Sequence, residues 1–301
     1  MTPFPELSII IVNYNQKKDT IECIQSLINA GAGYNQIIVV DNASTDGSIE
    51  AIYERYRDNI QIIHSNINKG YPYALNLGIP KALENGAEWV LMINNDTIVD
   101  KDLINQLNIA RQTHPEFSII SPIILYYNNP DLIWYLGYRI LPGTLIGYGS
   151  YRGRKFTYNL PEYKSVDLFH GCAMMVNRDV FNKIGLFDES QLIYGDDADF
   201  SIRAKQAGFK GAVATRAKLW HKVSATMGQQ NPKTRYLKIR NTVLFYRKYA
   251  HGLTKIIMQI FTLFRCLIIM LRDISMGNFK LIKPLWNGLL DGWRGQVPNR
   301  Y

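Results

Sequence analysis

Short apolar runs alternate with amphipathic stretches through the first hundred residues, and this alternation limits the fold more than any other feature. Residues 7–12 form a continuous and almost entirely apolar run, as expected of a strand buried on both faces of a parallel sheet. Similar runs follow at 36–40, 60–64 and 89–93, separated by helical patterns at 19–27, 48–56 and 71–85. Repeated strand–helix units of this length predict an α/β fold with an open, doubly wound and mostly parallel sheet.

Polar residues gather where the predicted strands end, at 13–15, 41–46 and 94–96. Ligands of open α/β sheets bind beyond the carboxyl ends of the strands. The sequence therefore predicts a binding site at this edge of the sheet.

The length and the cysteine content indicate the class of protein. The 301 residues, 47% of them hydrophobic and 20% charged, can form one large domain with an appendage. Three widely spaced cysteines (Cys23, Cys172 and Cys266) form neither a disulfide framework nor a CxxC metal site, which suggests a reducing compartment. The N-terminus has no basic segment or cleavage pattern, so we expect no signal peptide and a cytoplasmic location.

The positive charge is concentrated in the C-terminal tail. From Arg235 onward there are twelve Lys and Arg against two acids, or +10, whereas the preceding 234 residues have 22 bases and 23 acids, or −1. Residues 252–273 are nearly all apolar, with Gln259, Thr262 and Arg265 on one narrow stripe. A central Arg disfavours a spanning helix, so we expect a helix at the membrane surface. A basic, apolar tail on a near-neutral body suggests an anionic membrane surface rather than nucleic acid, so we expect no nucleic-acid binding. Packing on the rest of the chain or on a dimer partner is the alternative.

The motifs VVDNASTDGS (39–48) and NKGYPYALNLGI (68–79) suggest contacts to a nucleotide. Asp41 follows a buried strand and can accept a hydrogen bond from a base or a ribose, although a simple turn would use the same residues. Gly70 and Gly78 allow close backbone approach, and Asn68 and Asn76 supply amides. Neither motif is a P-loop or GxGxxG, which argues against ATP and NAD.

The motif MINNDTIVD (92–100) predicts a divalent metal site. Asp96, preceded by Asn94 and Asn95, offers hard oxygen ligands that suit Mg²⁺ or Mn²⁺ together with phosphate oxygens. A single carboxylate is a poor site, so His221 in the later motif LWHKVSAT is a candidate second ligand.

The stretch IYGDDADFSIRAKQAGFK (193–210) places Asp196, Asp197 and Asp199 at the start of a predicted helix. One acid would satisfy the helix dipole. Three crowded carboxylates suggest a further use, because crowding can raise the pKa of a carboxylate toward that of a general base.

Taken in order, these motifs resemble those of the family 2 glycosyltransferases with the GT-A fold. The resemblance is greatest to a bacterial branch with rhamnosyltransferases and galactofuranosyltransferases, and it covers residues 7–225. It rests on IIIVNYN, VVDNASTDGS, NKGYPYALNLGI, LMINNDT, HGCAMMVNRDVFNKIGLFDE, GDDADF and LWH.

The resemblance implies a division of the chain and a donor site. Residues 1–234 would form the catalytic domain, binding the nucleotide-sugar through 1–100 and the acceptor through 101–234, with 235–301 as a helical tail. The donor contacts would come from strand ends and loops: Asn13, Asn15, Asp41, Asn68, Gly70, Asn76 and Asn95. The usual glycine-rich stretch is replaced here by Tyr-Pro-Tyr-Ala at 71–74.

The resemblance also implies the catalytic groups. Asp96 would be the last residue of a DxD-type motif that reads Asn-Asn-Asp here, and His221 would complete its Mg²⁺ or Mn²⁺ site. Asp197 would be the catalytic base, and Asp196 would orient the acceptor. A single base without a covalent nucleophile implies inversion at the sugar.

The implied reaction moves a sugar, rhamnose being favoured, from a nucleotide-diphosphate donor to a saccharide or lipid-linked acceptor in cell-surface polysaccharide synthesis. It would take place at the inner face of the cell membrane. UDP-galactofuranose or a UDP-hexose is the alternative donor. A sugar-1-phosphate nucleotidyltransferase is disfavoured because residues 13–18 contain no glycine. A non-catalytic carbohydrate-binding relative is the remaining alternative, and the oligomeric state stays open.

Overall fold

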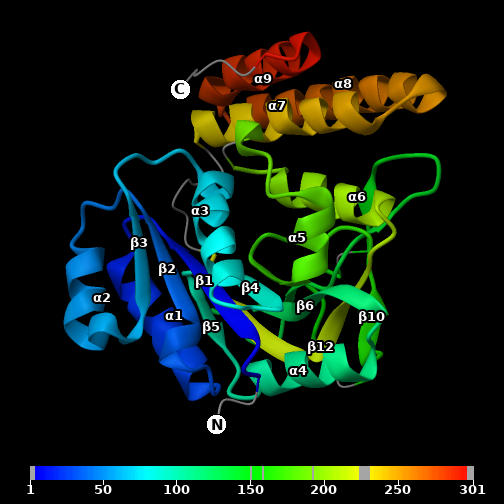
Figure 1. Cartoon of the computed structure of the whole chain (residues 1–301). Coiled ribbons are helices and arrows are strands. Elements are labelled where there is room, and N and C mark those ends of the chain that lie inside the picture. Colours follow the sequence, from blue (N-terminus) through cyan, green and yellow to red (C-terminus); the bar gives the residue numbers. More distant parts are fainter. Residues whose placement is uncertain (1–3, 150, 158, 192, 224–230, 297–301) are drawn as a thin grey trace. The chain divides into compact units, whose positions relative to one another are not determined.

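The computed structural model describes residues 4–149, 151–157, 159–191, 193–223 and 231–296 (Figure 1). The chain divides into two compact units. The sheet unit contains Met1–Arg139, Gly149–Leu192 and Asp196–Val223, and the helical unit contains Ile140–Tyr148, Ile193–Gly195 and Ser224–Tyr301.

One mixed sheet forms the centre of the sheet unit. Along its main path the strands are ordered β10-β12-β6-β11-β4-β1-β2-β3, with β5 paired to β12 and β7 paired to β6. The bounds are β1 Leu7–Asn13, β2 Ile37–Asn42, β3 Gln61–Ser65, β4 Trp89–Asn94, β5 Thr97–Val99, β6 Phe117–Tyr126, β7 Ile133–Tyr135, β10 Tyr163–Ser165, β11 Ala173–Asn177 and β12 Lys210–His221. A further pair, β8 (Arg139–Ile140) and β9 (Gly147–Tyr148), forms a separate two-stranded sheet.

Strand direction changes across the main sheet. The four strands β4, β1, β2 and β3 are parallel, as the strand–helix repeats predict. Beyond them β11 runs antiparallel to both β4 and β6, whereas β6 and β12 are parallel. The predicted α/β class is therefore confirmed. The parallel part is the N-terminal half, where β1, β2 and β3 are each followed by a helix that returns the chain to the other end.

The described residues of the sheet unit form six α-helices: α1 Lys17–Asn29, α2 Ser48–Tyr56, α3 Tyr71–Glu84, α4 Leu103–Thr113, α5 Arg178–Ile184 and α6 Asp196–Gln206. Helix α3 packs on β1 and β2, and α4 packs on β6 and β12. Gly78 of α3 lies directly against the sheet, because a Cβ there would come within 2.9 Å of methyl groups of both Ile10 and Val40. Gly78 thus permits close helix–sheet packing.

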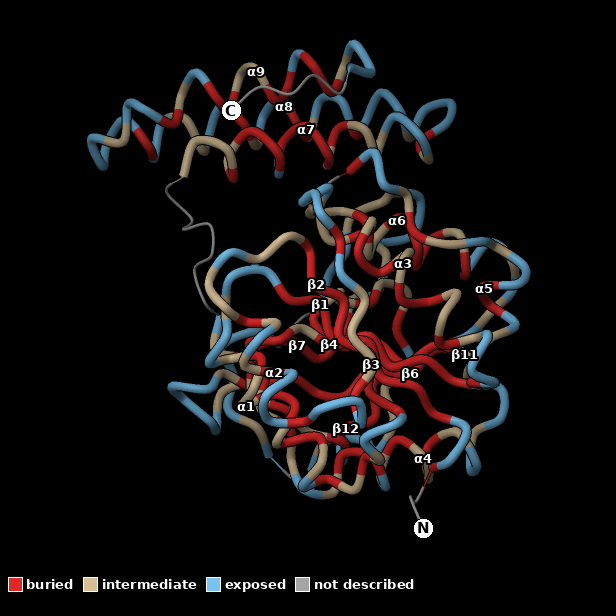
Figure 2. Tube along the Cα trace, turned by 60° about the vertical axis from the view of Figure 1, so that its left-hand side comes forward, coloured by how far each residue is buried: buried red, intermediate tan, exposed pale blue. Residues whose placement is uncertain are grey.

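The buried interior of the sheet unit is a single apolar core centred on the strands (Figure 2). All seven residues of β1 and all six of β2 are buried, which agrees with their mainly apolar sequence. Apart from Ser8 in β1, the polar side chains of these strands appear at Asn13 and at Asp41 and Asn42, where the strands end.

Three helices dominate the helical unit: α7 Pro232–Tyr249, α8 Gly252–Ser275 and α9 Ile282–Arg294. Gly288 and Gly292 let α9 approach α7 closely, since a Cβ on Gly288 would come within 2.6 Å of the Tyr236 carbonyl oxygen. A small core of Ile239, Val243, Cys266, Leu285 and Leu289 holds the three helices together. The predicted C-terminal helices are thus confirmed.

Candidate functional site

A buried polar pair joins the ends of β1 and β2. Asn13 and Asp41 are register partners in the parallel ladder, and the Asn13 Nδ2 atom donates to Asp41 Oδ1 at 2.8 Å. Asp41 Oδ2 accepts from the backbone N–H of Ser44 at 3.0 Å and lies 3.1 Å from His64 Nδ1. Asn13 and Asp41 are fully buried, whereas the His64 side chain is 49% exposed. The sequence reasoning missed His64, although its position at the end of β3 was a usable signal.

Asn15 connects the loops that follow β1 and β2. Its φ of 52° is left-handed, a conformation that asparagine tolerates. In this conformation its Oδ1 accepts from the backbone N–H of Thr45 at 2.7 Å, and its own N–H donates to Ser44 Oγ at 3.0 Å. Asn13, Asn15 and Asp41 therefore form one hydrogen-bonded corner.

Asn42, which the sequence analysis did not single out, connects Asn68 and Gly70 to the end of β2, beside this corner. The Nδ2 atom of Asn42 donates to Asn68 Oδ1 at 3.0 Å and to the Gly70 carbonyl at 3.1 Å. The Oδ1 atom of Asn42 is buried without a hydrogen-bond partner among the described residues. Gly70 has a φ of 98°, which favours glycine at this entry to α3.

Asn76 lies elsewhere. Its Nδ2 donates to the Phe187 carbonyl at 2.9 Å and to Glu189 Oε1 at 2.8 Å, and its Oδ1 accepts from the Phe187 N–H at 3.0 Å. The amide thus holds the segment after α5 against α3. The structure does not bring Asn76 into the polar corner, and a donor contact from it stays a prediction.

Asn95 links the polar corner to the metal-site motif. Its Nδ2 donates to Thr20 Oγ1 at 2.9 Å, and Thr20 Oγ1 donates to Asn13 Oδ1 at 2.6 Å. Asn95 is 8% exposed, so its side chain is committed to this internal network. Asn95 thus positions the turn between β4 and β5, on which Asp96 lies.

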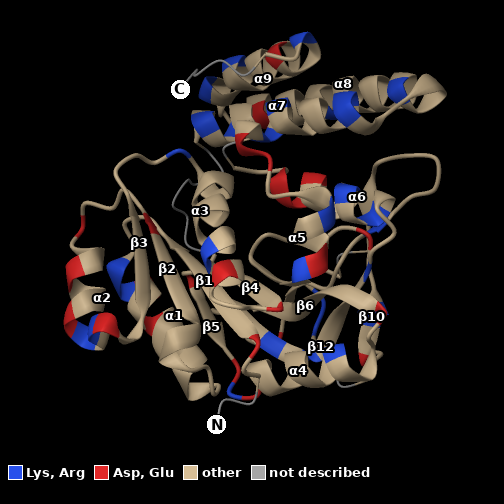
Figure 3. Cartoon of the chain, viewed as in Figure 1, with Lys and Arg blue, Asp and Glu red and all other residues tan. Residues whose placement is uncertain are grey.

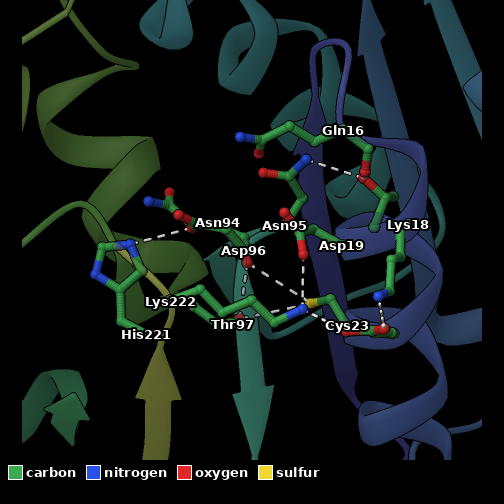
Figure 4. A network of polar contacts seen from close by, with 12 residues as sticks. Gln16, Lys18, Asp19, Cys23, Asn94, Asn95, Asp96, Thr97, His221 and Lys222 are labelled. Carbon is green, nitrogen blue, oxygen red and sulfur yellow. Dashed lines mark hydrogen bonds and ion pairs between the residues drawn. The ribbon is translucent and has the colours of Figure 1, made fainter. Parts of the chain in front are cut away.

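Asp96 and His221 are brought together by strand pairing. In the antiparallel ladder of β5 and β12, His221 is the register partner of Thr97, the residue after Asp96. The Nε2 atom of His221 lies 3.1 Å from Asp96 Oδ1, and both side chains are 8% exposed. Figure 4 shows the imidazole directed at this carboxylate.

This pair suits a divalent cation. Two ligands at right angles around an ion, each about 2.1 Å from it, would be about 3.0 Å apart, close to the 3.1 Å between Asp96 and His221. The Nε2 atom is the ring atom of His221 that faces the carboxylate, and the Nδ1 atom is buried without a hydrogen-bond partner among the described residues. No third His, Cys, Asp or Glu joins them in the described part of the chain. The pair could therefore supply two ligands, leaving the others to substrate oxygens and water.

Lys222, the residue after His221, forms its ion pairs with acids of α1 and not with Asp96. Its ammonium contacts Asp19 at 2.6 Å and also Glu22, both on α1, and these two acids raise its pKa against the effect of desolvation (Figure 4). Its backbone N–H donates to the Asp96 carbonyl at 2.9 Å. Lys222 thus fastens the end of β12 to α1 and to the turn that contains Asp96.

Asp197 lies at the start of α6 and is held by backbone donors. Its Oδ2 accepts from the Gly171 N–H at 2.9 Å, and its Oδ1 accepts from the Ala198 N–H at 2.8 Å. The Tyr71 hydroxyl donates to the Gly171 carbonyl at 2.9 Å. Burial and the nearby carboxylates, Asp196 first, hold the Tyr71 pKa well above its ordinary value, so the phenol stays protonated. Asp197 is thus oriented but remains partly exposed.

The three acids of α6 have different surroundings. Asp199 is fully buried and pairs with Arg203 Nε at 2.8 Å, and the same guanidinium donates to the carbonyls of Ile184 and Leu186. Asp199 therefore anchors α6 to the end of α5. Asp196 is 4% exposed, so Asp197 is the member most open to solvent.

The segment from His170 to Cys172 connects the two carboxylate sites. Gly171 bonds Asp197, and the carbonyl of Cys172 accepts from the Asn94 N–H at 2.9 Å, two residues before Asp96. Asp96 and Asp197 therefore approach this segment from two different elements.

Trp134, which the sequence analysis missed, packs beside the Asp96–His221 pair. The Trp134 ring packs edge-on against His170, with centroids 4.4 Å apart, and against His221, with centroids 4.6 Å apart. Burial lowers the pKa of His170 to about 4, although the charge of Asp197 opposes this shift. His170 is therefore neutral at pH 7. The Trp134 Nε1 atom is buried without a hydrogen-bond partner among the described residues.

Comparison with solved structures defines the class of fold. GalNAc-T7, solved with UDP, GalNAc and Mn²⁺, aligns with 81% of this chain and 48% of that chain at a TM-score of 0.61 and 15% identity. The mannosyltransferase PcManGT from Pyrobaculum calidifontis, solved with GDP-Man and Mn²⁺, aligns with 96% of this chain and 87% of that chain at a TM-score of 0.56 and 14% identity. The chain has the GT-A fold.

Sequence comparison identifies the family. The model for Glycosyl transferase family 2 matches residues 8–185, and the chain belongs to this family. The hexosyltransferase Agl10 of low-salt glycan biosynthesis in Haloferax volcanii is 33% identical over 214 residues, which are 68% of this chain and 63% of the relative. An N-acetylglucosaminyl-diphospho-decaprenol L-rhamnosyltransferase of Mycobacterium tuberculosis is 24% identical over 74% of this chain and 78% of the relative.

Proposed function

We propose that this protein transfers a sugar from a nucleotide-diphosphate donor to an acceptor hydroxyl with inversion at the anomeric carbon. The observation that carries the proposal is the arrangement at the carboxyl ends of the strands, where the Asp41 corner and the Asp96–His221 pair are connected through Asn13, Thr20 and Asn95. This arrangement offers separate places for a nucleoside and for a charged diphosphate.

The Asp41 corner is our candidate for the nucleoside site. One carboxylate oxygen of Asp41 accepts from Asn13, and the other contacts the Ser44 N–H and His64. Asp41 would thus hold these three residues in place while a base or ribose lies against the exposed His64. Asn15 and Asn68 would border the same place through their loops. Nucleoside recognition would then come from a preorganised polar corner.

Asp96 and His221 would hold Mg²⁺ or Mn²⁺, whose chemistry is to neutralise the charge that develops on the leaving nucleoside diphosphate. The burial of both side chains excludes bulk water from this place. Asn95 and Lys222 keep the turn that contains Asp96 in position from opposite sides.

Asp197 is the proposed general base. Its carboxylate would take the proton of the acceptor hydroxyl while the acceptor oxygen bonds to the anomeric carbon and the bond to the diphosphate oxygen breaks. Hydrogen bonds from Gly171 and Ala198 orient the carboxylate and leave its remaining lone pairs for the acceptor. One displacement from the opposite face gives inversion.

For the donor we propose a hexose or deoxyhexose, with rhamnose favoured, and for the acceptor a saccharide linked to a lipid diphosphate. The support comes from the activities of the two relatives, a hexosyltransferase and an N-acetylglucosaminyl-diphospho-decaprenol L-rhamnosyltransferase. Such an acceptor would place the reaction at the inner face of a cell membrane, in cell-surface polysaccharide synthesis.

The test is donor binding and hydrolysis across a panel of dTDP-rhamnose, UDP-galactofuranose, UDP-glucose, UDP-GlcNAc and GDP-mannose, with Mn²⁺, with Mg²⁺ and with EDTA. We expect metal-dependent binding of one donor, with turnover rising when a polyprenyl-diphosphate saccharide is added. Turnover of UDP-galactofuranose or UDP-glucose in preference to dTDP-rhamnose would overturn the choice of sugar. Binding of no donor under any condition would overturn the transferase proposal itself.

A further inference from the structure

Helix α8 exposes the residues that a soluble helix normally buries. Its buried side chains are Met258, Thr262, Cys266 and Asp273, which lie on one face. Ten large apolar side chains of the same helix are between 38% and 71% exposed: Leu253, Ile256, Ile257, Ile260, Leu263, Phe264, Leu267, Ile268, Leu271 and Ile274. We call these ten residues the α8 apolar face.

The α8 apolar face is continuous along the helix. Its members recur at spacings of three and four residues, so at 100° per residue they share one side, opposite Met258, Thr262 and Cys266. A helix of 24 residues is about 36 Å long. Single exposed apolar residues are scattered over ordinary protein surfaces and need no explanation. A contiguous exposed apolar surface of this extent, in contrast, marks an interaction site.

The polar side of α8 explains how the helix packs. Thr262 satisfies its hydroxyl by donating to the Met258 carbonyl at 2.6 Å, and Asp273 is paired with Arg235 of α7 at 2.6 Å. The face of α8 that contains its buried residues, Met258, Thr262, Cys266 and Asp273, therefore packs against α7 and α9. Packing within the helical unit thus leaves the apolar side free.

Charge distribution decides the kind of partner. Asp273 is the only acid in α8, and it is buried in its pair with Arg235. Arg265 and Arg272 are seven residues apart along one border of the apolar face, and the blue segments of the ribbon in Figure 3 mark the Lys and Arg residues of this unit. An apolar face bordered by bases and free of acids matches an anionic lipid surface, to which each basic residue adds about 1 kcal/mol.

We propose that α8 lies in the plane of an anionic membrane, with its apolar face in the acyl region and Arg265 and Arg272 at the headgroups. The helix has the length and hydropathy to cross a bilayer. A crossing would carry Arg265 and the Asp273–Arg235 pair to membrane depth, together with the basic helix α7 that packs on α8. The in-plane orientation keeps all of these charges at or above the interface.

A second copy of the chain is the competing occupant. A symmetric interface brings the same surface of both copies together. Such an interface would place Arg265 and Arg272 of both copies near each other, and both acids of the tail, Asp273 and Asp291, are buried in contacts within their own chain. No opposing acid of the tail is therefore exposed to balance these bases, which favours lipid.

The experiment is flotation of the full chain with vesicles of phosphatidylcholine alone and with about 30% phosphatidylglycerol. We expect binding to the anionic vesicles that weakens at about 0.5 M NaCl. Phe264→Glu combined with Leu271→Glu should lower the partition coefficient by at least about tenfold, since both exposed side chains would leave the acyl region. Ile67→Glu, at a 59% exposed position of the sheet unit, is the matched control and should bind as the original chain does.

A second measurement covers the case of a variant that fails to fold. The fluorophore NBD attached at Phe264→Cys should shift to the blue when anionic vesicles are added, and a label at Tyr53→Cys of α2 should not. Equal binding of the double Glu variant, or no shift at position 264, would overturn the proposal. A chain that ignores vesicles but is a dimer by light scattering, and becomes a monomer in the double Glu variant, would overturn it in favour of self-association. Donor turnover in detergent-free solution should be unchanged in these variants.

Discussion

The Nε2 atom of His221 lies 3.1 Å from the Oδ1 atom of Asp96, and neither residue is near the other in the sequence. The contact exists because β5 and β12 are antiparallel partners with His221 opposite Thr97. It places one imidazole and one carboxylate at the edge of the sheet where the Asp41 corner also lies. This relationship carries the metal part of the proposed mechanism.

Removal of either member of this pair should abolish dependence on the metal. We expect His221→Ala and Asp96→Asn each to reduce donor turnover on the order of 10²-fold, since stabilisation of the leaving group accounts for several kcal/mol. Mn²⁺ titration of donor binding by calorimetry is the measurement, with EDTA-treated protein as the reference. A His221→Ala variant with unchanged affinity for Mn²⁺ in the presence of donor would show that His221 is not a ligand.

Asp197→Asn should remove turnover and leave donor binding intact. Loss of a general base typically costs about 10²- to 10⁴-fold in rate, whereas the amide keeps an oxygen that can accept from Gly171. The measurement combines steady-state transfer with the dissociation constant of the donor. A variant that transfers sugar at the original rate would exclude Asp197 as the base, and one that loses donor binding would point to a structural role instead. A non-catalytic carbohydrate-binding protein would be indifferent to the substitution.

Asp199→Asn is the matched comparison, two residues further along α6. Its carboxylate is fully buried against Arg203, so the substitution leaves a guanidinium without its anionic partner. Breaking such a buried pair costs about 3–5 kcal/mol. We expect a lower midpoint of thermal unfolding and an unchanged rate of sugar transfer per folded molecule. Retention of the original unfolding midpoint would contradict the anchoring role of Asp199.

The neutral imidazole of His170 should make stability fall in mild acid. Burial lowers the folded pKa to about 4 from the ordinary 6.5, so between these values the unfolded chain binds more protons than the folded chain. Stability is therefore fully present above pH 6.5 and is lost as the pH falls toward 4. Asn at position 170 can still accept from the Cys172 N–H, so His170→Asn should flatten this part of the profile. Urea unfolding measured from pH 4 to 7 tests this, and parallel profiles for both proteins would refute it.

The three thiols should be inert in the folded protein. Cys23, Cys172 and Cys266 are all buried and free, and burial raises the pKa of Cys23 to about 12. Because the thiolate is the reactive form, alkylation by iodoacetamide at pH 8 should be slow until denaturant is added. Mass spectrometry of the labelled protein is the measurement. Rapid modification of Cys23 in native buffer would contradict its burial beneath Thr97 and the turn that contains Asp96.

The sequence by itself determined much of the fold and the candidate residues. Periodicity is a local property, and the mainly apolar runs at β1, β2 and β4 predicted strands that are buried on both faces. The polar residues at the strand ends predicted the shared edge, and the ordered motifs predicted the GT-A fold. The catalytic roles of Asp96, Asp197 and His221 remain predictions.

Only the tertiary structure decided which of those residues meet and which do not. The register of β5 and β12 pairs Asp96 with His221, and the same folding assigns Asp199 to Arg203 and the Asn76 amide to the Phe187 segment. Trp134 could not be found from sequence, because an isolated aromatic residue has no pattern that reports its neighbours. Likewise the composition of α8 permitted several locations, and packing of Thr262 and Asp273 against the other helices determined that its apolar side faces outward. Long-range register and packing depend on residues far apart in the chain, which local periodicity does not encode.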